Sequence, residues 1–175
     1  MLTEGEANYL ARLPKEVLEK PVEIFTWGDY GDYGLKIAGI VMDEIRFTVP
    51  GLEIIFMGSM ALGITGQKDI DLSILSPAED FPIHRPKLEK QFGSPDKIAN
   101  TAVGWHFMRD GYEVGIYLTD PVKSQVQIQL DVFNLLKNDS NLLNEYEELK
   151  IEAKGLPYRE YQIRKYDFFH KILAD

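Results

Sequence analysis

The sequence contains no cysteine, which excludes disulfide frameworks, thiolate zinc sites and cysteine nucleophiles. Long hydrophobic runs are also missing, because no apolar stretch approaches the roughly 20 residues that a membrane-spanning helix needs. The first residues are acidic and lack the basic start and the apolar stretch of a secretory signal. We therefore expect a soluble, cytoplasmic protein without a membrane partner.

Positive charge is scarce as well. The chain has 19 Lys and Arg against 28 Asp and Glu, which gives a formal net charge of −9. Binding to DNA, RNA or anionic membranes depends on basic residues that neutralise phosphates, so we expect no general nucleic-acid affinity. Residues 150–175 differ from the rest, with six basic and four acidic residues. A small phosphorylated ligand held between this segment and the acidic remainder is compatible with that distribution.

The length and composition predict one folded unit. A chain of 175 residues with 45% hydrophobic content suffices for one well-packed core, and it has no repeat, low-complexity tract or long linker. We expect a single domain over residues 1–175, with a core at about 22–120 and C-terminal helices at about 121–175.

Hydrophobic periodicity and turn residues predict the order of elements in the first half of the chain. We expect a helix at 4–19, an edge strand at 22–27, a turn at 28–32, a helix that ends before Pro50, and strands at 52–57 and 69–75. The end of the helix before Pro50 is sharp because the residue before a proline avoids the α-helical region.

The second half predicts a hairpin followed by helices. After a helix at 85–92, two strands at 103–108 and 112–118 flank Asp110-Gly111, a favoured hairpin turn. Helices should then begin near Asp120-Pro121, at Asp139 or Ser140, and near Pro157. The predicted fold class is α/β (α+β), a mixed β-sheet flanked by helices with a C-terminal helical segment.

Two carboxylates on the strand at 69–75 carry the strongest chemical signal. Side chains two apart on a strand share a face, so Asp69 and Asp71 should project together while Ile70 enters the core. Their repulsion reaches about 4 kcal/mol at roughly 4 Å and an effective dielectric of about 20. A hard divalent cation, Mg²⁺ or Mn²⁺, is the natural partner.

Gly58-Ser59 ends the preceding strand and is a candidate phosphate site. Glycine lets a phosphate approach the backbone, and the Ser59 hydroxyl can donate a hydrogen bond to it. Alternatively, the aspartates only line the solvent-exposed face of a half-buried strand, and Gly58-Ser59 is only a turn. The combination of both motifs on consecutive strands favours a site. Glu113 is the candidate third metal ligand or base, with an exposed structural role as the equal alternative.

These motifs resemble the nucleotidyltransferase superfamily, and the wider sequence from about Val22 to Leu173 resembles its GrpB-like branch. The later runs 145–150 and 161–169 carry the resemblance to the branch. In active members of the superfamily, the acidic residues bind Mg²⁺ and the Gly-Ser turn holds a nucleoside triphosphate. The resemblance therefore implies transfer of a nucleotidyl group to an acceptor that the sequence does not identify.

The chain also departs from the GrpB-like pattern. Gly115 and Tyr117 stand where the branch usually has a His-x-His pair, and residues 132–137 lack an Arg-Asp pair. Neither Gly115 nor Tyr117 can act as an imidazole base or metal ligand. An alternative function follows, namely a catalytically inactive nucleotide-binding or protein-interaction module on the same fold, in which the C-terminal aromatic helices could dock a partner.

Lys150 and Lys165 interrupt apolar or aromatic stripes of the last two predicted helices. Each either reaches past the core to water or an acidic neighbour, or contacts the aspartates or a bound phosphate. His84, His106 and His170 show no metal-binding spacing and no partners along the sequence, so we assign them no role. The sequence does not indicate an oligomeric state.

Overall fold

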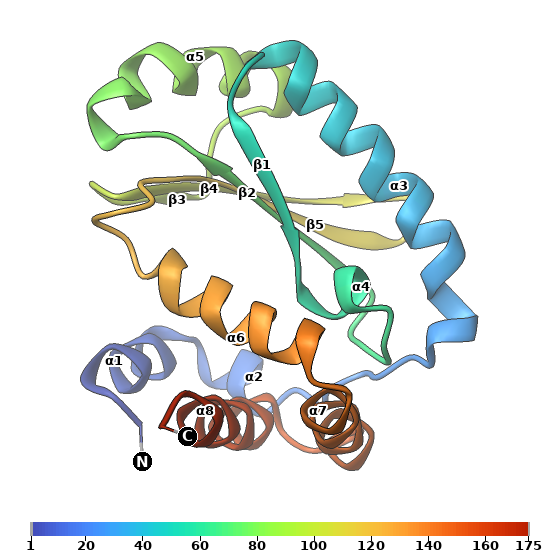
Figure 1. The fold of residues 1–175 in the computed structure, drawn as a ribbon. Coiled ribbons are helices and arrows are strands. Elements are labelled where there is room, and N and C mark those ends of the chain that lie inside the picture. Colours follow the sequence, from blue (N-terminus) through green and yellow to red (C-terminus); the bar gives the residue numbers. More distant parts are fainter. Residues whose placement is uncertain (1, 175) are drawn as a thin grey trace.

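A five-stranded sheet forms the middle layer of the protein, in the order β1-β2-β5-β4-β3 (Figure 1). The computed structural model describes residues 2–174, so Met1 and Asp175, the two ends of the predicted domain, lie outside it. Strands β2 and β5 are parallel and the other neighbours are antiparallel. The strands are β1 (Glu53–Met57), β2 (Asp69–Leu75), β3 (Lys97–Ile98), β4 (Ala102–Arg109) and β5 (Tyr112–Thr119). The predicted mixed sheet flanked by helices is confirmed.

Helices α3 (Trp27–Thr48) and α5 (Phe81–Phe92) cover one face of the sheet (Figure 1). Alternate residues of the strands point into this layer, because neighbouring side chains on a strand take opposite faces. Burying each such side chain contributes roughly 1.5–3 kcal/mol. Fully buried strand residues of this main core are Ile70, Leu72, Ile74, Val114, Ile116 and Leu118.

The remaining long helices lie across the opposite side of the sheet (Figure 1). They are α1 (Glu4–Arg12), α2 (Lys15–Leu18), α6 (Val126–Asn138), α7 (Ser140–Glu152) and α8 (Tyr158–Ala174). Two smaller apolar clusters join α6, α7 and α8, one around Leu136 and Phe168 and the other, which includes Ile24, around Tyr161. The sheet face turned toward them carries polar side chains and glycines.

The strands and their hairpin follow the sequence prediction closely. The strand predicted at 69–75 has the observed bounds of β2, and β4 and β5 meet at Asp110-Gly111, as expected. Both residues have positive φ angles, 50° and 82°, which suit the tight two-residue hairpin turn. The short strand β3 was not predicted.

The N-terminal predictions are wrong in part. Residues 4–19 form two helices, α1 and α2, because Pro14 lacks the N–H that a continuous helix needs. Residues 22–27 do not form a strand. Residues 22–26 make an irregular segment, and Trp27 already begins α3. An isolated bridge within the segment pairs Phe25 with Gly66, and another just before it pairs Pro21 with Pro157.

Residues 28–32 belong to α3 and not to the expected turn. Gly31 in this segment and Gly34 just after it serve close packing. A β carbon at Gly31 would overlap the ring of Trp27, and one at Gly34 would overlap Met60. The helix can therefore approach α4 (Gly58–Leu62) closely, which a local reading of the glycines does not reveal. Its end at Thr48, before Pro50, is as predicted.

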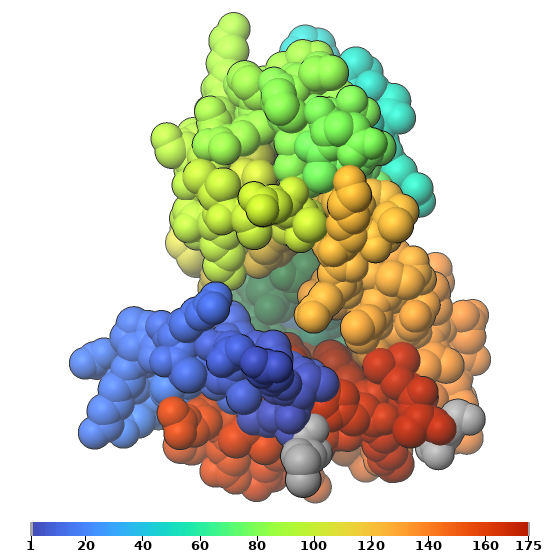
Figure 2. All heavy atoms as spheres, turned by 90° about the vertical axis from the view of Figure 1, so that its left-hand side faces the viewer, coloured from blue at the N-terminus to red at the C-terminus, as the bar shows by residue number. Residues whose placement is uncertain are grey.

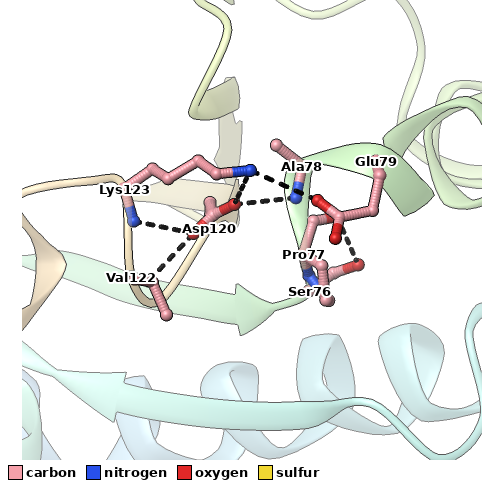
Figure 3. A network of polar contacts seen from close by, with 7 residues as sticks. All are labelled: Ser76, Pro77, Ala78, Glu79, Asp120, Val122 and Lys123. Carbon is pink, nitrogen blue, oxygen red and sulfur yellow. Dashed lines mark hydrogen bonds and ion pairs between the residues drawn. The ribbon is translucent and has the colours of Figure 1, made fainter.

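Asp120 closes a turn and does not begin a helix, since α6 starts at Val126. Its carboxylate accepts hydrogen bonds from the backbone N–H groups of Val122 and Lys123, at 2.9 and 2.8 Å, and of Ala78, at 2.8 Å (Figure 3). The Lys123 ammonium lies 3.3 Å from the Glu79 carboxylate. Asp120 thus joins the connections that follow β2 and β5, at the end of β2 away from Asp69.

Helices α7 and α8 match the prediction. Asp139 caps α7 by accepting hydrogen bonds from two backbone N–H groups, Asn141 and Leu142, and α8 covers Tyr158–Ala174. His170 on α8 contacts the Glu6 carboxylate on α1 at 2.9 Å, so this histidine has a partner that its sequence neighbours do not reveal. No helix in the described part of the chain is long and apolar enough to cross a membrane.

Candidate active site

Asp69 and Asp71 lie at the start of β2, on the sheet face turned toward the C-terminal helices. The apolar residues between and after them, Ile70 and Leu72, are fully buried in the opposite layer. In the strand register Asp69 pairs with Glu113, and Asp71 pairs with Gly115. The two aspartates are half-buried and project from the same face, as the sequence predicted.

Gly58 adjoins Asp71 directly. Its φ angle is +79°, a conformation that glycine adopts without strain, and a β carbon built on it would lie 2.5 Å from Oδ2 of Asp71. Ser59 follows in α4 and is 5% exposed. A β carbon at Gly66 would lie 3.1 Å from the Oγ atom of Ser59, so the loop before β2 encloses the serine side chain. The two motifs of the sequence therefore meet in space.

Glu113 stands beside Asp69 on β5 but is exposed. Within residues 2–174, no group of three or more acidic or histidine side chains is arranged to hold a metal ion. Mg²⁺ does not need such a group, because it is commonly held by one or two carboxylates together with waters and substrate phosphates. Asp69 and Asp71 fit that mode, and Glu113 as a third ligand stays a prediction.

The electrostatics of Asp71 favour a bound cation. Removal from water raises the pKa of Asp71 to about 7, and the neighbouring charge of Asp69 adds to the increase. Lys165 and Lys150 act in the opposite direction, and Glu113 raises the pKa slightly further. A divalent cation between the two carboxylates would favour their ionised forms, because it supplies the positive charge that both lack.

Lys150 is buried on α7, with 3% of its surface exposed. Its ammonium donates a hydrogen bond to the Tyr161 hydroxyl at 2.8 Å and lies 4.8 Å from the centre of the Tyr146 ring. Burial lowers the pKa of Lys150, and the charges of Asp69 and Asp71 partly offset this effect. The side chain therefore does not extend to water and stays within the electrostatic reach of the acidic pair.

Lys165 lies on α8 among three aromatic rings. Its ammonium is 5.9 Å from the ring centres of Tyr161 and Tyr166, and 5.8 Å from that of Phe169. It is half-buried, and its charge lowers the pKa of Asp71 more than that of Lys150 does. Both lysines thus act on the aspartates, while a phosphate contact for either one stays a prediction.

Glu147 is a supporting residue that the sequence did not single out. Its carboxylate accepts a hydrogen bond from the backbone N–H of Thr65 at 2.8 Å, across 82 positions of sequence. Tyr30 donates a hydrogen bond to the carbonyl of Ile64 at 2.6 Å, from the other side of the same loop. These bonds fix the loop that leads into Asp69. No local pattern could have revealed them, because each partner lies on a distant element.

A hollow opens onto this polar region. Figure 2 shows it between the N-terminal helices and α8 below, α6 at one side and the segment around β3 above, with atoms in the green of the α4–β2 segment at its floor. Solvent and a ligand can therefore approach the sheet face that carries the aspartates from this side.

No protein-family model and no curated protein sequence matches this chain. Solved structures that resemble it in part include two of Cid1. One is described for its RNA terminal uridylyl transferase activity (14% identity, TM-score 0.48), and the other is the Cid1 poly(U) polymerase with MgGTP bound (13% identity, TM-score 0.46). Another is the STING-associated CdnE c-di-GMP synthase from Capnocytophaga granulosa (17% identity, TM-score 0.42). The matches cover 66%, 66% and 70% of this chain, and 40%, 42% and 46% of the others. This chain therefore spans less than half the length of those structures. The GrpB-like resemblance stays a prediction.

Proposed function

We propose that this chain is a nucleotidyltransferase that binds a nucleoside triphosphate together with Mg²⁺ and transfers the nucleotidyl group to an acceptor. The contact between Gly58 and Asp71 carries the proposal, because it joins a glycine turn to a pair of carboxylates on the next strand. A turn that admits phosphates and a carboxylate pair that holds their metal ion are the two parts such a reaction needs.

The residues have distinct roles in this proposal. Asp69 and Asp71 hold the metal ion, and the backbone at Gly58-Ser59 accommodates the outer phosphates. Lys150 and Lys165 supply positive charge from the helical side, where they already act on Asp71. When bound, Mg²⁺ would neutralise charge on the triphosphate and polarise the phosphate that is attacked.

The protein contributes mainly positioning and electrostatics to the reaction. An acceptor oxygen attacks the α-phosphorus, and pyrophosphate leaves with the electrons of the broken bond. Such a transfer needs no covalent intermediate with the enzyme, provided that the acceptor and donor are held in line. The hollow between α8 and the segment around β3 opens this side of the protein to both.

A second function has its own support: a nucleotide-binding or protein-interaction module that does not catalyse transfer. Gly115 and Tyr117 stand where the resembling branch usually has a His-x-His pair, and residues 132–137 lack its Arg-Asp pair. A protein of this kind would bind the nucleotide and release it unchanged.

Isothermal titration with ATP, GTP, CTP and UTP, with and without Mg²⁺ or Mn²⁺, tests both functions. The informative variant carries Asp69→Asn and Asp71→Asn. Its matched control carries Asp32→Asn and Glu53→Gln, which remove the same charge at exposed positions. We expect metal-dependent binding in the wild type and the control, and its loss in the site variant.

Release of pyrophosphate from the bound triphosphate distinguishes the two functions. Metal-dependent release supports the transferase, and binding without release over a range of hydroxyl acceptors supports the module. Turnover that survives the double Asn change would rule out the acidic site as the catalytic centre.

A further inference from the structure

Three residues on adjacent strands lie in a row across the sheet face of the site. Asp71 on β2 pairs with Gly115 on β5, and Gly115 pairs with His106 on β4. Paired residues of neighbouring strands share a face, so an acidic side chain, a glycine and an imidazole follow one another. A β carbon at Gly115 would lie 3.6 Å from Oδ1 of Asp71 and 3.5 Å from Cδ2 of His106. The space above Gly115 thus has the carboxylate on one side and the imidazole on the other.

The ring of Tyr117 borders the same space. Tyr117 lies two residues beyond Gly115 and therefore on the same face. A β carbon built on Gly115 would lie 3.4 Å from Cε2 of Tyr117. One built on Gly104, which pairs with Tyr117 from β4, would lie 3.0 Å from Cε1. The ring fits between two glycines, because a side chain at either position would crowd it. It meets the His106 ring edge to face, with 5.2 Å between centroids.

Hydrogen bonds fix His106 at both ring nitrogens. Nδ1 lies 2.8 Å from the carboxylate oxygens of Asp96, and Nε2 lies 2.5 Å from the hydroxyl of Tyr117. A carboxylate can only accept, so Nδ1 carries the hydrogen atom. In the neutral ring Nε2 is then the acceptor, and the Tyr117 hydroxyl donates to it. The three residues form a chain from carboxylate to imidazole to phenol.

We propose that the hydrogen-bonded series of Tyr117, His106 and Asp96 takes up the proton that the attacking hydroxyl loses. Tyr117 is the catalytic residue, which contacts this hydroxyl. His106 and Asp96 position Tyr117 and carry the charge. The inference rests on the proposed transferase function. It also gives His106, which has no recognisable partners in the sequence, a role beside the acidic pair.

The proton balance of the step is complete. The acceptor oxygen bonds to the α-phosphorus, the bond to pyrophosphate breaks, and pyrophosphate leaves with that electron pair. The acceptor proton passes to the Tyr117 oxygen as the phenol proton passes to Nε2 of His106. Asp96 stabilises the resulting imidazolium, which later returns its proton to water.

The environment of the phenol fits a relay better than a free base. Removal from water raises the pKa of Tyr117, and the charges of Asp71, Asp96 and Glu113 add to the increase, as does Tyr9 on α1. The ammonium of Lys97 lies 5.8 Å from the centre of the Tyr117 ring. The phenol thus keeps its proton at neutral pH and can accept another only if it passes its own to His106.

The test compares Tyr117→Phe, His106→Asn and the double variant with two controls, Tyr33→Phe and His84→Asn. Tyr33 is exposed and His84 lies on α5, the layer on the opposite side of the sheet. Each reaction contains a nucleoside triphosphate, Mg²⁺ and a hydroxyl probe, either ribose or a short oligoribonucleotide. Nucleotide affinity is measured separately by titration calorimetry.

We expect each site variant to reduce kcat by about 100-fold or more, while the nucleotide Kd changes by less than about threefold. The double variant should be no worse than either single one, because the residues act as a unit. The controls should retain wild-type turnover. Turnover that persists in Tyr117→Phe and in His106→Asn would overturn this inference but not the proposed function. A wild type without metal-dependent turnover would overturn both.

Nitrogen NMR of the imidazole gives a readout that does not depend on activity. In the wild type at about pH 8, Nε2 of His106 should have the shift of an unprotonated, hydrogen-bonded acceptor, and Tyr117→Phe should abolish the hydrogen-bond contribution. A protonated Nε2 in the neutral ring would overturn the relay. A nucleotide attached to Tyr117, detected by mass spectrometry, would overturn it too, because the phenol would then be the acceptor itself.

Discussion

Gly58 lies so close to Asp71 that any other residue at position 58 would displace the Asp71 carboxylate. The β carbon of any other residue would stand 2.5 Å from Oδ2 of Asp71, well inside van der Waals contact. The positive φ angle of Gly58 sets the direction of this approach. The glycine turn and the carboxylate therefore depend on each other, and a change at one is felt at the other.

Gly58→Ala should impair both stability and ligand binding. The strained φ angle costs about 1–3 kcal/mol of unfolding free energy, and the new methyl group displaces the Asp71 carboxylate. We expect metal-dependent nucleotide binding to weaken by about tenfold or more. Urea unfolding and titration calorimetry measure the two effects.

Gly51→Ala is the matched control, because Gly51 also has a positive φ angle, +87°, but no atom lies within 4 Å of its added β carbon. It should lose comparable stability and keep full nucleotide affinity. Equal loss of binding in both variants would show that backbone strain, and not the contact with Asp71, explains the effect.

The stability of the metal-free protein should fall as pH rises from about 4 through about 7. The pKa of Asp71 is about 7 in the folded protein and 3.8 ordinarily, so the folded state binds a proton that the unfolded chain releases in this range. Asp71→Asn lacks this proton linkage. In EDTA, its Tm should exceed that of the wild type by several degrees at pH 8, and the difference should disappear toward pH 4 to 5.

Mg²⁺ should raise the Tm of the wild type at pH 8 but not that of Asp71→Asn, since only the wild type has both carboxylates of the proposed metal site. Thermal unfolding in EDTA and in Mg²⁺ checks this prediction. Parallel pH profiles for the two proteins would contradict a raised pKa at Asp71.

Lys150→Met and Lys165→Met should each weaken the binding of a nucleoside triphosphate by about tenfold or more, because each removes a positive charge that acts on the acidic site. Lys154→Met is the control, since Lys154 is exposed just beyond the end of α7. Calorimetric titration measures all three. Affinity that is unchanged in the first two variants would mean that these lysines have a structural role only.

Glu147→Ala should destabilise the protein by about 1–3 kcal/mol, because the backbone N–H of Thr65 loses its partner. The loop before β2 becomes less ordered, so nucleotide binding should weaken as well. Glu147→Gln keeps an acceptor oxygen and should have a smaller effect. Glu148→Ala, at an exposed neighbouring position of α7, is the control and should unfold like the wild type. Similar losses in both alanine variants would contradict the anchoring role of Glu147.

The parts of the fold that the sequence predicts well are those encoded by short-range patterns. The alternation along 69–75 predicts β2 and the common face of its aspartates, and Asp110-Gly111 predicts the hairpin. The segments at 22–27 and 28–32 were misassigned because distant contacts decide their conformation. Phe25, for example, forms an isolated bridge with Gly66, which is distant in the sequence.

The candidate site shows the same division. Gly58 and the aspartates lie on consecutive elements, and their spacing along the chain reveals them. Glu147 and His106 could not be recognised, because their partners come from other strands and loops. For His106, the register between β4 and β5 brings Gly115 alongside, and no property of a single strand specifies that register.

The order of elements along the chain has a consequence for biosynthesis. The β-sheet with Asp69 and Asp71 leaves the ribosome before α7 and α8, which carry Lys150 and Lys165. Until those helices dock, the carboxylates lack their positive neighbours and the loop before β2 lacks Glu147. The nascent protein can therefore assemble its apolar layer early, but the residues of the proposed site come together only after the last helix has been synthesised.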